Sequence, residues 1–95
     1  MRFMCSHTVP PHALNVDQLR QVSTAAQNDP KVRGYRSFFN LSAGKIFCVI
    51  EAPDENTLVD WFKKMNLSYD MILPVEYEGD RGTIYEEPSV PAGAH

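Results

Sequence analysis

Three side chains in this sequence, two thiols and one imidazole, have the chemistry to bind a metal ion together. Cys5 and His7 stand two residues apart, and on a β-strand that spacing directs both side chains to one face. Cys48 lies inside an apolar segment, KIFCVIE, that ends at Glu51. Thiolate and imidazole ligands suit zinc, nickel or copper. If the two strands are neighbours, Cys5 or His7 can approach Cys48, with Glu51 as an additional oxygen donor.

The same residues also have a purely structural interpretation. A metal site needs three or four ligands, and the sequence contains neither a CxxC pair nor an HxxxH helix pair. Free cysteine is often a small buried hydrophobe, so Cys5 and Cys48 can equally be core residues. His7 precedes a turn with two prolines, where an imidazole can cap backbone groups or line a cavity. The sequence is consistent with a metal-binding role and with a purely structural role for these residues.

The elements that must position these groups follow from the spacing of apolar residues. Strands are predicted over residues 2–9, 32–41, 45–51 and 70–78. A first helix is predicted to begin at Asn15, with Gln18 completing a capping box, and to end before Pro30. A second helix is predicted to begin near residue 54 and to end near Asn66.

This order of elements, βαββαβ, predicts the α+β ferredoxin-like fold: a four-stranded antiparallel sheet with two helices on one face. The strand order in that fold is 4-1-3-2, so the first and third strands are neighbours. Pro74 falls in the last strand, which is an edge strand in this order and tolerates proline. We predict one domain over residues 1–79 and a C-terminal arm or flexible tail over residues 80–95.

The central strands are apolar on both faces, which predicts a homodimer. Ile46, Cys48 and Ile50 share one face of the third strand, whereas Phe47 and Val49 occupy the other. The second strand likewise places Tyr35, Phe39 and Leu41 on one face and Phe38 on the other, and Ser37 shares the face of Tyr35. A second copy of the chain would cover the face without helices, giving a dimeric α/β sandwich or barrel.

Composition excludes several classes of protein. The 95 residues carry a net charge of −3 and no cluster of lysines and arginines, which gives no basis for binding nucleic acid or an anionic membrane. No apolar run approaches the roughly 20 residues of a membrane span. The N-terminal segment lacks the apolar core of a signal peptide, and two cysteines without an export signal indicate a reducing compartment. We therefore expect a cytoplasmic protein.

A resemblance to a known family rests on the segment FCVIEAPDE. It is supported by weaker matches at His7 to Pro11, at Tyr35 to Phe39 and at Pro74-Val75-Glu76. Over roughly residues 2–79 the chain resembles a bacterial family of small ferredoxin-like proteins, catalogued as a domain of unknown function, some members of which are described as nickel-binding. The resemblance implies a divalent transition metal such as nickel as ligand. Where many members carry a histidine in the second helix, this chain has Trp61.

Three functional hypotheses follow. The first is a small dimeric protein that binds a divalent metal through His7 and Cys48, with Cys5 and Glu51 as auxiliary ligands, and that carries out no catalysis. The second is an enzyme of the dimeric α/β-barrel type, oxygenase- or isomerase-like, which binds a small molecule between sheet and helices. Its pocket would contain Tyr35, Ser37 and Trp61, and His7 or Tyr35 would act as acid or base. The third is an interaction module whose proline-rich tail docks on a partner.

Overall fold

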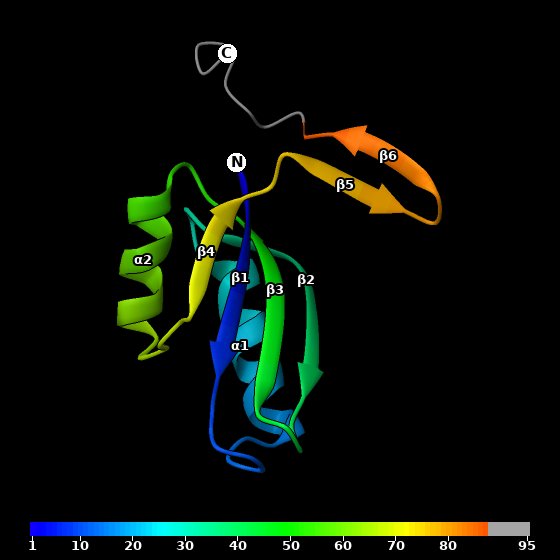
Figure 1. Cartoon of the computed structure of the whole chain (residues 1–95). Coiled ribbons are helices and arrows are strands. Elements are labelled where there is room, and N and C mark those ends of the chain that lie inside the picture. The colour runs from blue at the N-terminus through cyan, green and yellow to red at the C-terminus, as the bar shows by residue number, and fades with distance from the viewer. Residues whose placement is uncertain (88–95) are drawn as a thin grey trace.

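The structure follows the predicted succession of strands and helices and adds one hairpin (Figure 1). The computed structural model describes residues 1–87. Its elements, in chain order, are β1 (Arg2–Thr8), α1 (Val16–Asn28), β2 (Arg33–Asn40), β3 (Lys45–Glu51), α2 (Glu55–Lys64), β4 (Met71–Pro74), β5 (Tyr77–Asp80) and β6 (Thr83–Glu86).

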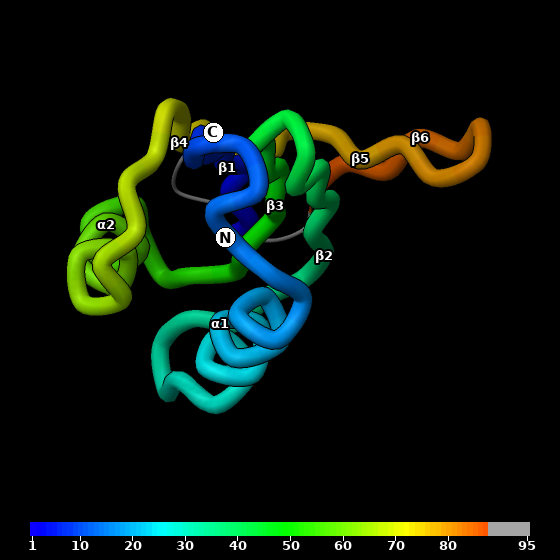
Figure 2. The backbone as a smooth tube through the Cα atoms, turned by 90° about the horizontal axis from the view of Figure 1, so that it is seen from below, coloured from blue at the N-terminus to red at the C-terminus, as the bar shows by residue number. Residues whose placement is uncertain are grey.

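Four strands form one antiparallel sheet, and both helices lie on the same side of it (Figure 2). The strand order is β2-β3-β1-β4, which is the predicted order read from the other edge. This α+β architecture is consistent with the predicted ferredoxin-like fold. Pro74 lies in β4 at the edge of the sheet, where the missing N–H group is tolerated. Within residues 1–87, no helix has the length and apolar character required to cross a membrane.

Local side chains set the beginnings of both helices. The side chain of Asn15 accepts the Gln18 N–H at 2.9 Å, and the side chain of Gln18 accepts the Asn15 N–H at 2.8 Å, so the predicted capping box is present. Asp54 caps α2 by accepting the Thr57 N–H at 2.7 Å. Asn66, with φ of 58°, follows the end of α2 in the left-handed conformation, as expected for a residue that stops a helix.

The sheet has one face buried beneath the helices and one open face. Phe3, Cys5 and His7 of β1 are buried beneath the helices, as are Ile46, Cys48 and Ile50 of β3. The core continues into the helices through Leu58, Trp61 and Phe62. On the other side, which we call the open face, four large apolar side chains are 40–60% exposed: Met4, Phe38, Phe47 and Leu73.

One residue of β2 departs from the predicted alternation. The pairing of β2 with β3 shifts between Gly34 and Arg36, so that Tyr35 occupies a β-bulge. Its ring packs on the guanidinium of Arg2, 3.9 Å from Cζ to the ring centroid. The prediction that Tyr35 shares a face with Ser37 is therefore wrong, because the bulge adds one residue and breaks the two-residue period.

Residues 77–86 form a hairpin that the sequence analysis did not predict. Arg81 and Gly82 both have positive φ, which is the geometry of the tight turn that joins two antiparallel strands. The base of the hairpin is attached to the sheet, since Arg2 lies 3.6 Å from Glu78 and 3.4 Å from Glu87. The predicted boundary between residues 79 and 80 falls inside this hairpin, and residues 88–95 of the predicted tail lie outside the described part of the chain.

Two glycines with positive φ provide a matched test of how the β2–β3 turn is held. A Cβ atom at Gly44 would collide with the carbonyl of Val9, whereas a Cβ atom at Gly82 would meet nothing within 4 Å. Gly82→Ala should therefore lower the free energy of unfolding by no more than about 1–2 kcal/mol, the cost of the left-handed backbone alone. Gly44→Ala should cost clearly more in urea denaturation. Equal losses in the two variants would contradict the close approach of Val9 to the turn.

Candidate functional site

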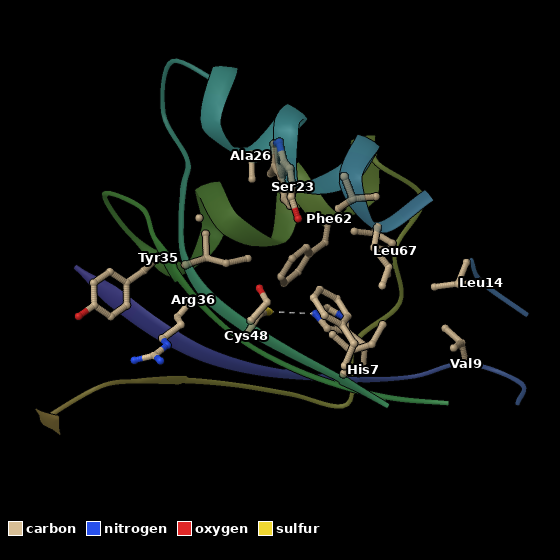
Figure 3. A pocket seen from close by; sticks show the side chains of 18 of the residues that line it. His7, Val9, Leu14, Ser23, Ala26, Tyr35, Arg36, Cys48, Phe62 and Leu67 are labelled. Carbon is tan, nitrogen blue, oxygen red and sulfur yellow. Dashed lines mark hydrogen bonds between the residues drawn. The ribbon is translucent and has the colours of Figure 1, made fainter. Parts of the chain in front are cut away.

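His7 and Cys48 meet on the buried face of the sheet (Figure 3). The Nε2 atom of His7 lies 3.5 Å from Sγ of Cys48. Both side chains are nearly buried, with 6% and 8% of their surface exposed. The two residues come from neighbouring strands, because β1 and β3 pair in the register that places Cys5 opposite Cys48 and His7 opposite Ile46. The sequence-based expectation that these strands bring a thiol and an imidazole together agrees with this geometry.

Cys5 completes a group of three residues around Cys48. It lies directly across the β1–β3 ladder from Cys48, so the two side chains are on the same face of the sheet. Cys5 is 1% exposed, and both cysteines are free thiols. Cys48 is the more accessible of the two and lines the pocket described below. Cys5 is thus a second thiol next to Cys48, and it is buried more deeply.

Cys5, His7 and Cys48 shift one another's pKa values. The neighbouring Cys5 thiol is the largest cause that lowers the pKa of the Cys48 thiol to about 6, and His7 lowers it further, against the effect of burial. The pKa of Cys5 is raised by its interaction with the neighbouring Cys48 and by burial, and its thiol donates to the Phe3 carbonyl at 3.8 Å. One thiol of the pair therefore ionises readily and the other stays protonated.

His7 is held in one orientation by the loop that follows α2. Its Nδ1 lies 2.7 Å from the carbonyl oxygen of Ser68, and its ring packs edge-on against Phe62 with centroids 5.0 Å apart. A carbonyl only accepts, so Nδ1 carries the proton and Nε2 faces Cys48. Burial alone would lower the pKa of His7, but the hydrogen bonds with Cys48 and Ser68 outweigh it, and the pKa is raised.

Two of the predicted site residues lie away from this group. Glu51 forms an ion pair with Arg2 at 3.3 Å, at the far end of β3 and on the open side of the sheet. The hydroxyl of Tyr35 donates a hydrogen bond to Glu78 at 3.0 Å, and the ring points away from the pocket (Figure 3). Neither side chain is placed to act together with His7 and Cys48.

The three predicted pocket residues, Tyr35, Ser37 and Trp61, border a pocket between the sheet and the two helices, Tyr35 with its ring turned outward. Its volume is about 500 Å³. Ser37 lies opposite Cys48 in the β2–β3 ladder, and Trp61 contributes from α2. The wall from α1 is mainly apolar, with Leu19, Val22 and Ala26, and also contains the polar residues Ser23 and Gln27. The pocket therefore combines an apolar enclosure with a few polar groups, which is typical of a small-molecule site.

Sequence reasoning missed two components of this site. The Ser68 carbonyl is a backbone group in a loop, and no residue type marks it in advance. The apolar residues of α1 follow a helical period that predicts burial, yet Leu19 and Val22 are only half-buried because they border the pocket. Their incomplete burial is visible only once the separation of the helices is known.

An ionised thiol beside an oriented imidazole can bind a soft or borderline metal ion, or it can act as a nucleophile. Within residues 1–87, however, no three His, Cys, Asp or Glu side chains gather closely enough to hold a metal ion by themselves. The described side chains thus supply two adjacent donor atoms, Nε2 of His7 and Sγ of Cys48, and the pocket supplies the open space beside them.

Comparisons with known proteins agree on one relationship. A family model described as "Nickel responsive protein SCO4226-like" matches residues 3–75. Among solved structures, the crystal structure of SCO4226 from Streptomyces coelicolor A3(2) is similar to this chain with a TM-score of 0.68 at 23% identity, covering 83% of this chain and 100% of that one. This likeness shows a shared fold. No curated protein gives a significant match.

The thiol titration provides a direct test of the site. Thiolate absorbance at 240 nm should rise with an apparent midpoint of about pH 6, because the Cys48 thiolate is stabilised by Cys5 and His7. Cys5→Ala and His7→Ala should each move the midpoint upward, and Cys48→Ala should remove the transition. A wild-type midpoint in the ordinary thiol range, near 8.5, would contradict the described group.

Proposed function

The chain belongs to the SCO4226-like family of nickel responsive proteins, and from this premise we propose that it binds a divalent transition metal, nickel by the family's description, through His7 and Cys48. The proposed role is uptake of the ion for buffering or sensing, without catalysis. The observation that carries the proposal is the pairing of an oriented imidazole nitrogen with a readily ionised sulfur on the buried face of the sheet.

The distance between the two donor atoms suits a shared ion. For an ion of the size of zinc, bonds of about 2.0 Å to nitrogen and about 2.3 Å to sulfur at a tetrahedral angle place the two ligand atoms about 3.5 Å apart. Nε2 and Sγ lie 3.5 Å apart in this structure. The Ser68 carbonyl on Nδ1 is the kind of outer partner that metal-binding histidines have, because it fixes the tautomer and directs Nε2 at the ion.

The described side chains supply only part of the coordination sphere of the proposed metal ion. His7 and Cys48 fit as two ligands, and Cys5 lies behind Cys48 as the nearest further thiol. Glu51, predicted as an auxiliary ligand, is instead engaged with Arg2. Water or a small donor molecule from the pocket would occupy the remaining coordination positions. We therefore propose moderate affinity that depends on pH, since the thiol and imidazole must lose their protons to bind.

Calorimetric titration with Ni²⁺ tests this site. His7→Ala and Cys48→Ser should each reduce the affinity about 10-fold or more, because each removes one of two donor atoms. Glu51→Gln is the matched control and should stay within about twofold of wild type, since the carboxylate pairs with Arg2. Circular dichroism confirms that each variant is folded. Unchanged affinity in both His7→Ala and Cys48→Ser would refute the assignment.

We also propose that the protein acts as a homodimer joined through the open face. The four apolar side chains of this face come from four adjacent strands, and Phe38 and Phe47 stand directly opposite each other. A flat apolar sheet face can pack against an identical one across a twofold axis. The β5–β6 hairpin, which lies beyond the residues matched by the family, extends from the sheet and exposes Tyr77, Ile84 and Tyr85 as further apolar surface.

Sedimentation equilibrium tests the dimer. Phe47→Glu should convert a dimer at micromolar concentration into a monomer, because it places a charge at the centre of the proposed interface. Val16→Glu is the control, because Val16 is 51% exposed at the start of α1 on the opposite side of the sheet. A wild-type monomer, or dimers in both variants, would contradict this interface.

A further inference from the structure

The pocket between the helices and the sheet has features that metal binding does not require. Two half-buried α1 residues, Leu19 and Val22, face a volume of about 500 Å³ that the chain itself leaves unfilled. Phe39, on the helix-facing side of β2, is 41% exposed even though it lies on the same side of the sheet as the core. The apolar stripe of α1 therefore packs against the core only in part, through Val22 and Ala26, and borders the pocket over the rest.

Water is a poor occupant of such a space. Ordered water in a protein interior needs several polar partners. Within residues 1–87, no buried side-chain nitrogen or oxygen lacks a hydrogen-bond partner, so none of them requires a water molecule in the pocket. Protein interiors are otherwise close-packed, and an apolar enclosure of this size falls in the range of ligand pockets. An apolar molecule would recover the contacts that the half-buried residues lack.

The polar groups of the pocket define the ligand further. No Lys, Asp or Glu is among its lining residues, and the side chain of Arg36, which borders it, points away (Figure 3). His7 and Cys48 satisfy each other as a pair. Ser37, opposite Cys48 on the neighbouring strand, is exposed and offers one hydroxyl at the sheet side of the pocket. The lining therefore offers no free charge to an ionic ligand, because His7 is paired with Cys48 and the Arg36 side chain is directed away.

We infer that this pocket is a binding site for a small uncharged molecule with a mainly apolar body and one hydrogen-bonding group. The apolar body lies between α1 and α2, against Val22 and Trp61. The hydrogen-bonding group is directed at the sheet, near Ser37 and Cys48. This site goes beyond the proposed metal binding and does not depend on it, because the α1 wall contains no metal ligand.

Two fluorescent probes of the same skeleton test the inference. N-phenyl-1-naphthylamine is uncharged with one N–H group, and 8-anilinonaphthalene-1-sulfonate is the same ring system with an added anionic group. Titrated in the presence of EDTA, the neutral probe should bind with micromolar affinity and the sulfonate at least about 10-fold more weakly, since the Arg36 side chain points away from the pocket and His7 is paired with Cys48. Absence of binding by the neutral probe, or equal binding of both, would overturn the inference.

Substitutions in α1 test whether the neutral probe binds in the pocket. Val22→Trp fills the pocket from its α1 wall and should weaken binding of the neutral probe about 10-fold or more. Val16→Trp, at an exposed position of the same helix that does not line the pocket, should stay within about twofold of wild type. Binding that survives Val22→Trp but is lost in Phe47→Glu would place the probe on the open face and refute the pocket. Should Val22→Trp prove unfolded by circular dichroism, Leu19→Phe replaces it with the same expected loss.

Discussion

The antiparallel register of β1 against β3 is the constraint on which the rest of the site depends. It sets Cys5 opposite Cys48 and carries the side chain of His7 to the same face two residues further on. A slip of one residue would turn these side chains to the open face and bring Met4 and Ser6 inward. The register is fixed from both sides, because β1 is a central strand that also pairs with β4, where Cys5 faces Ile72.

β1 also positions the loop that orients the imidazole of His7. The Asp70 N–H donates to the Ser6 carbonyl at 2.8 Å, and the Thr8 hydroxyl donates to the Asp70 carboxylate. These bonds hold the segment after α2 against β1, and thereby hold the Ser68 carbonyl at Nδ1 of His7. Strand and loop together therefore decide which nitrogen faces the thiol. The chemistry of the pair is a property of backbone placement as much as of residue identity.

Much of this architecture could be predicted from the sequence. The capping box at Asn15 and the apolar run of β3 are local signals, and both lead to the right elements. The proximity of His7 to Cys48 follows once β1 and β3 are known to be neighbours. Tyr35 could not be placed, because a bulge has no distinctive residue requirement and reverses the side-chain direction beyond it.

The hairpin and the α1 wall of the pocket were missed for different reasons. The turn at Arg81-Gly82 is a recognisable local pattern, but the high content of glycine and proline in the surrounding segment favoured a flexible tail. The pocket depends on the distance between two helices that the chain separates by two strands, and periodicity contains no information about that distance. The sequence pattern therefore predicts residues such as Val22 to be ordinary core positions.

Trp61 gives this protein an intrinsic optical reporter. It is the sole tryptophan of the chain, it is 4% exposed, and it borders the pocket. Its ring lies 5.8 Å from that of Phe62, which in turn packs on His7. Indole emission responds to the polarity and charge of its surroundings, so the ultraviolet fluorescence of the unmodified protein originates at one known position, one aromatic ring away from the imidazole.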